Sequence, residues 1–241
     1  MPPPDVARVP EPHSADAKTI RGTDRDGDEM RRPNTQRQAD RRTGILDAAE
    51  HCFARSGFHQ TSMQEICAEA GMSPGNLYRY FPSKEAIIAA IAERDRAQAA
   101  ADFAAVDQAS DFFTGFAALG RQYLVERSDQ EIALCLEIMA EARRNPEVRR
   151  IYQAIDTDVH RGLVAVLRRA AERGELRSDL DFDKIVKVLL ALGDGIECRR
   201  AIDSSFDPES VIAIVLDLVR YTLTDCALVR TEANKESSDE R

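Results

Sequence analysis

The chain has 241 residues, 43% of them hydrophobic, which is enough for one large or two smaller folded domains and excludes a wholly disordered chain. A net charge of -9 would normally exclude binding to a polyanion, but the charge is unevenly distributed. Residues 31–92 carry 8 basic and 6 acidic side chains and residues 93–241 carry 21 and 29, so only the earlier segment would tolerate a polyanion.

The chain shows no sign of a membrane segment or an export signal. No stretch approaches the ~20 uninterrupted apolar residues of a membrane span, and the N-terminus is Pro-rich and polar where a signal peptide would be apolar. We therefore expect a cytoplasmic protein without a membrane partner.

The cysteines are isolated from one another. They lie far apart, mostly in apolar helical patterns, and none forms a C-x-x-C pair: Cys52, Cys67, Cys135, Cys198 and Cys226. We interpret them as small buried hydrophobic residues, with a redox-sensing thiol as the alternative for any one of them.

Residues 1–33 are rich in Pro, Asp, Arg and Gly and have no apolar period, so we expect a disordered tail. The basic end of this tail continues into the first helix. It either acts as an arm that reaches DNA phosphates or a minor groove, or is simply exposed to solvent. The arginines concerned are Arg31, Arg32, Arg37, Arg41 and Arg42.

Every later segment has apolar residues at helical spacing, which predicts an all-α fold of about nine helices. The first helix carries an apolar stripe from Ile45 to Phe53 and ends before Gly57, a residue suited to a left-handed cap. The expected helices span residues 35–56, 62–71, 73–80, 83–105, 111–127, 130–144, 145–174, 182–202 and 208–226, and residues 229–241 should be a frayed tail.

The second and third helices form a helix-turn-helix pattern. The second begins at a capping box, Ser62 with Glu65, and ends at Gly71, and the third begins with Ser73 as N-cap and Pro74 at the first helical position. Such a pair is typical of DNA-binding proteins but also occurs in other helical proteins, so the pattern alone leaves the function open.

The composition of the third helix favours DNA. Leu77 and Phe81 share one face and should anchor the helix to its neighbours. The opposite face combines small residues that permit close approach, an asparagine that can read adenine, an arginine, and tyrosines whose hydroxyls can donate to phosphate: Gly75, Asn76, Tyr78, Arg79 and Tyr80. A surface of this kind indicates a helix that enters a major groove.

Two helix starts beside this helix are expected to hold the DNA backbone. Ser83 and Lys84 open the fourth helix, where free N–H groups and the helix dipole favour a phosphate. A similar clamp is expected at the start of the second helix, through Thr61, Ser62 and Gln64, with N-capping as a compatible role for the hydroxyl residues.

The run from Gly57 to Ala86, and above all Leu-Tyr-x-Tyr-Phe-x-x-Lys at residues 77–84, resembles the DNA-binding domain of the TetR/AcrR family over roughly residues 37–90. The resemblance implies that one set of residues faces base edges or adjacent backbone: Ser73, Pro74, Gly75, Asn76 and Tyr78. It implies that a second set holds phosphates: Thr61, Gln64, Tyr80 and Lys84.

The same resemblance implies a DNA-binding domain at residues 34–82 and an effector-binding and dimerisation domain at residues 83–228. The last two helices should pair with those of a second copy, and their wide apolar arcs support this, although a buried core helix would look similar. Candidates for an effector pocket are aromatic or polar residues of the middle helices, each of which could instead serve the core or surface: Phe113, Phe116, Tyr123, Met139, Tyr152, Asp156, His160, Asp194 and Arg199.

These features predict a homodimeric transcriptional regulator, a repressor released from a near-palindromic double-stranded operator by a small molecule. The alternatives are the same dimer controlled by a protein partner or by nothing, and, more remotely, a helical-bundle enzyme. No Glu-x-x-His, H-E-x-x-H or phosphate-binding Gly loop is present, so we assign no catalytic residue, metal or cofactor.

Overall fold

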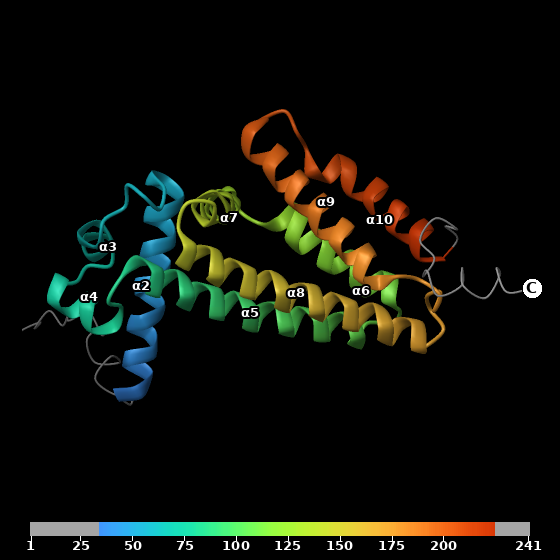
Figure 1. Ribbon diagram of the computed structural model, residues 1–241, viewed down its shortest axis with the longest axis horizontal. Helices are drawn as coiled ribbons and strands as arrows, with labels where there is room; N and C mark the ends of the chain where they lie inside the picture. The colour runs from blue at the N-terminus through green and yellow to red at the C-terminus, as the bar shows by residue number, and fades with distance from the viewer. Residues whose placement is uncertain (1–33, 225–241) are drawn as a thin grey trace, which may run out of the picture. The chain divides into compact units, whose positions relative to one another are not determined.

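The computed structural model describes residues 34–224, and the elements that it contains in this range are helices (Figure 1). This confirms the predicted all-α class. They are α2 (Asn34–Ser56), α3 (Met63–Glu69), α4 (Pro74–Tyr80), α5 (Lys84–Gln108), α6 (Phe112–Arg121), a π-helix η1 (Gln122–Glu126), α7 (Asp129–Ala142), α8 (Pro146–Glu172), α9 (Phe182–Ile202) and α10 (Pro208–Thr224). The predicted tails, and Cys226, lie outside the described residues.

The chain divides into two compact units, one ending at Asp40 and one beginning at Arg41. In the described part of the first unit, Gln36 Nε2 donates to Asp40 Oδ1 at 2.9 Å along the first turns of α2. In the second unit, we call α2 from Arg41 onward, α3 and α4 the head, and the helices from α5 onward the body.

The head has an apolar core to which its three helices each contribute. The predicted stripe of α2 is buried, and Phe53, Ile66 and Leu77 are at most 1% exposed. Ile88 of α5 and Val148 of α8 belong to the same core, so helices of the body pack against the head and contribute to its core. Gly57 (φ +80°) and Gly71 (φ +63°) adopt left-handed conformations where α2 and α3 end, which glycine does without steric cost.

In the body, α5 and α8 run alongside each other (Figure 1). A second core gathers residues from α6, α8, α9 and α10, including Phe112, Leu167, Val186 and Leu223. None of the helices between Asn34 and Thr224 combines the length and apolar character that a membrane crossing needs.

The predicted helix over residues 111–127 is wrong in one respect. Its α-helical part ends at Arg121, and Gln122–Glu126 form a π-turn, with bonds from residue i to i+5. At this turn Gln122 Nε2 and Tyr123 Oη both donate to Asp102 Oδ2 of α5, at 3.1 and 2.8 Å. The apolar spacing does not distinguish a π-turn from an α-helix, because the two differ by a single residue.

Candidate nucleic-acid interface and sensor region

The turn between α3 and α4 is built from local signals. Ser62 and Glu65 form the predicted capping box, with Ser62 Oγ accepting from Glu65 N at 3.2 Å and Glu65 Oε2 accepting from Ser62 N at 2.6 Å. The bond from Ser62 lowers the pKa of Glu65. At the other end, Met72 N donates to Cys67 O at 3.0 Å and Ser73 is the N-cap of α4, although its side chain makes no capping bond. The chain therefore reverses tightly between the two helices.

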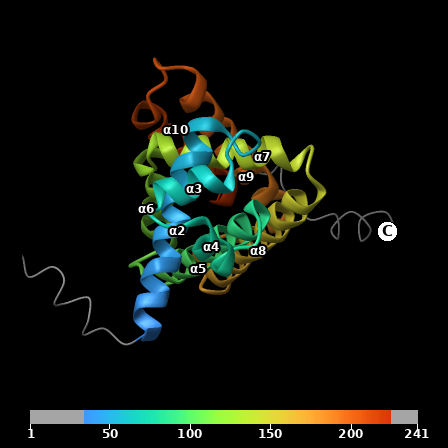
Figure 2. The same ribbon diagram turned by 90° about the vertical axis from the view of Figure 1, so that its left-hand side faces the viewer.

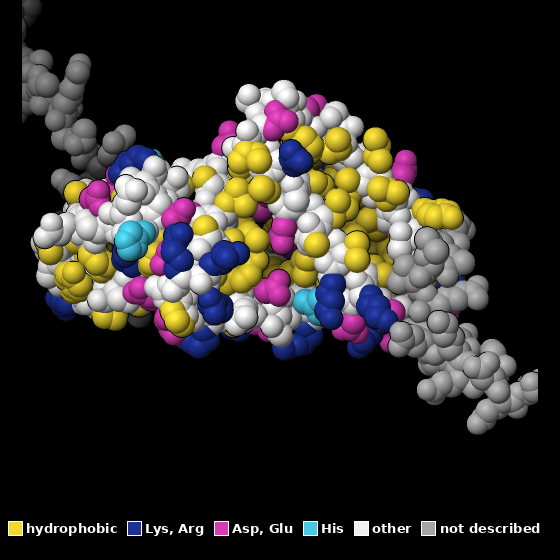
Figure 3. Space-filling model, turned by 45° about the horizontal axis from the view of Figure 1, so that its top comes forward, with side chains coloured by type: hydrophobic (Ala, Val, Ile, Leu, Met, Phe, Trp, Pro, Cys, Tyr) yellow, Lys and Arg dark blue, Asp and Glu magenta, His cyan; other side chains and the backbone are white. Residues whose placement is uncertain are grey.

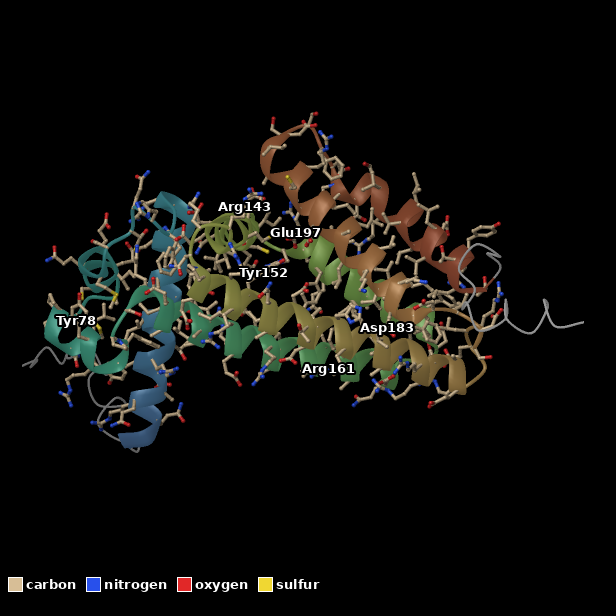
Figure 4. The ribbon with its side chains drawn as sticks, in the orientation of Figure 1. Tyr78, Arg143, Tyr152, Arg161, Asp183 and Glu197 are labelled. Carbon is tan, nitrogen blue, oxygen red and sulfur yellow. The ribbon has the colours of Figure 1, made fainter. Side chains whose placement is uncertain are left out.

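The short helix α4 separates an anchoring face from an exposed face. Leu77 is 0% exposed and Phe81 2%. Figure 2 views the molecule from the side of α3 and α4. Tyr78 is 51% exposed and points away from the helix into solvent (Figure 4). The exposed set also contains Ser73, Pro74, Gly75 and Arg79, whereas Asn76 and Tyr80 are half-buried. The division predicted from sequence is therefore present, with Tyr80 packed partly against the core.

The expected phosphate-binding residues fall into two groups. Ser62 and Gln64 are exposed at the start of α3. Thr61 is 1% exposed, and its hydroxyl lies 2.8 Å from Gly57 O and 3.1 Å from Cys52 O. The Lys84 ammonium donates to backbone carbonyls of the loop between α2 and α3. The polar groups of Thr61 and Lys84 are thus bonded within the protein.

Several charged groups lie around the helix-turn-helix. The Arg42 guanidinium lies 4.6 Å from the centre of the Phe81 ring, directly after the end of α4. On the far end of α3, His51 Nδ1 lies 2.7 Å from Glu69 Oε1, and this bond lowers the pKa of Glu69. The pairing keeps an acidic side chain of α3 tied to α2.

The expected effector residues do not line one cavity. Phe113 and Phe116 border a hollow of about 260 Å³ between α6 and α10, where the Arg220 guanidinium lies 4.0 Å from the centre of the Phe113 ring. His160 borders a separate hollow of about 450 Å³ beside α8, with its Nε2 3.2 Å from Asp183 O. Arg199 is exposed on α9, and Met139 is half-buried on α7.

Tyr152, Asp156 and Asp194 come together between α8 and α9, where Figure 4 shows Tyr152 near Glu197. Burial first, and then the neighbouring carboxylates, raise the pKa of Tyr152 to about 12. Desolvation, together with the charges of Glu197 and Asp156, also raises the pKa of Asp194. This part of the body is a polar cluster in which acidic groups predominate.

Sequence reasoning missed the centre of this cluster. Arg127 Nη1 donates to Glu197 Oε1 at 2.5 Å, and Glu197 is 7% exposed. Burial and the nearby Glu197 raise the pKa of the Cys135 thiol to about 11, so the thiol stays protonated near neutral pH. A charged residue inside the apolar pattern of α9 was the only available signal. Among residues 34–224, no three His, Cys, Asp or Glu side chains lie together as metal ligands would.

Apolar side chains gather on the surface of the last two helices (Figure 3). On α9 they are Val188 (67% exposed), Leu192 and Ile202, and on α10 Ile214, Leu218 and Tyr221. We call these six residues the apolar face. Large exposed apolar groups concentrated on two helices are typical of an interaction surface.

Comparison with known proteins agrees with this architecture. Residues 45–91 match the family of bacterial regulatory proteins of the tetR type, and residues 117–224 match the C-terminal region of BetI-type transcriptional repressors. The HTH-type transcriptional regulator UidR of Escherichia coli K12 is 34% identical over 155 residues, which cover 64% of this chain and 79% of UidR.

Solved structures show the same fold. Salmonella enterica GusR superimposes with a TM-score of 0.67 at 33% identity, covering 78% of this chain and 96% of GusR. FadR of Bacillus subtilis, solved in complex with stearoyl-CoA, superimposes with a TM-score of 0.65 at 21% identity, covering 73% and 96% of the two chains, and shows the fold alone. The protein therefore belongs to the TetR family of transcriptional regulators.

Proposed function

We propose that the protein is a homodimeric repressor that binds a near-palindromic operator through α4 and is released when a small molecule binds in the body. The observation that carries this proposal is the exposed face of α4, where Tyr78 is 51% exposed beside Arg79 and Gly75. A tyrosine hydroxyl, a guanidinium and a residue without a side chain, exposed together on one short helix, suit a surface that meets DNA.

In this proposal the contacts divide by chemistry. Asn76 and the small residues at the start of α4 approach base edges, while Tyr78, Arg79 and Tyr80 contact the sugar-phosphate backbone or neighbouring bases. Ser62 and Gln64 at the exposed start of α3 hold phosphate. We take residues 34–82 as the DNA-binding domain and residues 83–228 as the regulatory domain.

The second copy is proposed to cover the apolar face. Three of its side chains are each more than 60% exposed in one chain: Val188 and Ile202 on α9 and Ile214 on α10. Pairing of these two helices with a second copy would remove their apolar surface from water. Two heads about one DNA turn apart, roughly 34 Å, would read the two half-sites.

For the effector, we propose the polar cluster of Tyr152, Asp156 and Asp194 on α8 and α9, and the hollow bordered by Phe113 and Phe116. The stearoyl-CoA in FadR supports a ligand within this fold but not the identity of the ligand here. We propose no catalytic role, because neither region combines a nucleophile with a positioned base.

The test begins with duplexes selected from a random library by the purified protein. We expect a near-palindromic consensus, and for Asn76→Ala an altered base preference at one position in each half-site, with discrimination falling by about 1–3 kcal/mol. Failure to enrich any sequence would contradict the proposal.

Release is tested separately by a thermal-shift screen of metabolites. A compound present at a hundred times its Kd should stabilise the protein by about 2.7 kcal/mol and should also dissociate the selected duplex. If the duplex is bound but no compound in a broad screen acts, a regulator without a small-molecule effector replaces the effector part of the proposal.

A further inference from the structure

The ammonium group of Lys84 lies inside a ring of backbone carbonyls. Lys84 Nζ donates to Phe58 O at 2.5 Å, to Thr61 O at 2.7 Å and to His59 O at 3.4 Å. It also lies 4.4 Å from the centre of the Phe58 ring, whose side chain is 3% exposed. All three N–H donors of the ammonium therefore have partners within the loop of residues 57–62, which we call the α2–α3 loop.

Lys84 stands at the first position of α5, where the positive end of the helix dipole disfavours a cation. Desolvation lowers the pKa of Lys84, while Glu85 and Glu141 act in the opposite direction. The converging carbonyl oxygens offset both penalties by supplying negative partial charge around the ammonium. Moving it to a DNA phosphate would leave those oxygens without their donor.

A carboxylate from the body holds the other side of the same loop. Glu137 Oε1 of α7 accepts from Phe58 N at 2.9 Å. A Cβ on Gly57 would lie 2.9 Å from the same oxygen, so a side chain there would make this carboxylate shift. Phe58 thus has its N–H bonded to Glu137 and its C=O bonded to Lys84, and the loop leads directly to the exposed N-cap Ser62.

We infer that Lys84 is a positioning residue for DNA binding, shaping the α2–α3 loop together with Glu137 of α7, and is not a phosphate contact. This inference rests on the proposed function and reverses the role that the family resemblance implies for Lys84. Its consequence is that the charge of Lys84 matters less than the geometry of its three donors.

The test compares the charge-conserving variant Lys84→Arg with wild type and with Arg79→Met. The probes are a duplex selected by the wild-type protein and a scrambled duplex of the same composition, titrated over a range of salt concentrations. A planar guanidinium cannot place its donors as the ammonium does. We expect Lys84→Arg to lose about tenfold in affinity for the selected duplex, with little change on the scrambled one.

The salt dependence separates the two roles. For both Lys84→Arg and Lys84→Met we expect the slope of log affinity against log salt to equal that of wild type. Arg79→Met, as the matched control for a cation exposed on α4, should reduce that slope by about 0.9. The inference is overturned if Lys84→Arg binds as wild type does while Lys84→Met reduces the slope by about 0.9.

A second variant covers the case in which Lys84 variants do not fold, as judged by circular dichroism. Glu137→Ala removes the carboxylate of α7 that accepts a hydrogen bond from Phe58 N. We expect this variant to bind the selected duplex more weakly without a change in the salt slope. In a double-mutant cycle with Lys84→Arg the two losses should be less than additive, because both act on Phe58. Wild-type affinity in Glu137→Ala, or full additivity, would contradict the inference. Failure of the wild-type protein to select any duplex would instead contradict the proposed function.

Discussion

Buried polar groups in the head and in the body find their partners at different distances along the chain. In the head, the Thr61 hydroxyl lies next to carbonyl oxygens only four and nine residues away. In the body, Arg127 and Glu197 pair across 70 residues and two helices. The turns of the head therefore follow short-range signals, although its α2–α3 loop also bonds to Lys84 and Glu137 of the body, whereas the body itself depends on how whole helices pack.

The largest effect should come from the head core. Leu77→Ala removes a fully buried side chain that anchors α4, and we expect a loss of stability of about 2–5 kcal/mol. The measurement is urea unfolding followed by circular dichroism. Tyr78→Phe, which alters the neighbouring exposed residue, should leave the midpoint unchanged. A small loss in Leu77→Ala would mean that α4 is not packed as described.

The apolar face of the body should give the next largest effect. Leu218→Glu places a charge at a side chain that is 56% exposed in one chain, so the fold should persist. If a second copy covers it, the variant should be monomeric by light scattering. It should then lose about a hundredfold in affinity for a two-site duplex, since half of the ~4–10 kcal/mol of specific binding is removed. A dimeric Leu218→Glu with wild-type affinity would exclude this face as the interface.

Ion pairs of the body and of the head provide a direct comparison of the regions. Glu197→Gln leaves the partly buried Arg127 without a counter-charge, and we expect a loss of about 2 kcal/mol, below the ~3–5 of a fully buried pair because the Arg127 side chain is 25% exposed. Glu69→Gln in the head breaks exposed pairs with His51 and Arg55, which solvent screens, and should cost clearly less stability than Glu197→Gln. Equal losses of stability in the two variants, measured by chemical unfolding, would contradict the expectation that the partly buried pair of the body stabilises more than the exposed pairs of the head.

The smallest effect concerns the two N-caps of the helix-turn-helix. Ser62→Ala removes the side-chain acceptor of a capping box and should cost about 1 kcal/mol. Ser73 makes no side-chain capping bond, so Ser73→Ala should leave the stability within about 0.5 kcal/mol of wild type. Thermal unfolding of both variants measures the difference, and a larger loss in Ser73→Ala would show that its hydroxyl caps α4 in solution.

The features that sequence predicted well are those with short-range causes. The Ser62–Glu65 box, the left-handed Gly57 and Gly71, and the buried face of α4 all follow from residues within a few positions of one another. Each is set by backbone chemistry that acts over one or two turns of helix. The all-α class follows in the same way from apolar spacing.

The destinations of long side chains could not be predicted. Lys84 is predicted to face a phosphate because it opens α5, and nothing in the sequence indicates that its ammonium also reaches carbonyl oxygens of a loop 26 residues earlier. The effector candidates likewise fall into separate regions, because sequence indicates which residues are aromatic or polar but not which helices meet. The roles assigned to individual DNA-contacting residues stay predictions until the binding experiments are done.

The π-turn at Gln122–Glu126 marks a place where the end of α6 can lose a residue. A turn that closes from i to i+5 holds one more residue than the α-helical register requires. Deleting that residue would restore α-helical bonds and leave the facing of the flanking segments unchanged, because the wide turn already absorbs it. A one-residue deletion there should therefore be tolerated better than one inside α6, which would rotate all later side chains of the helix by about 100°.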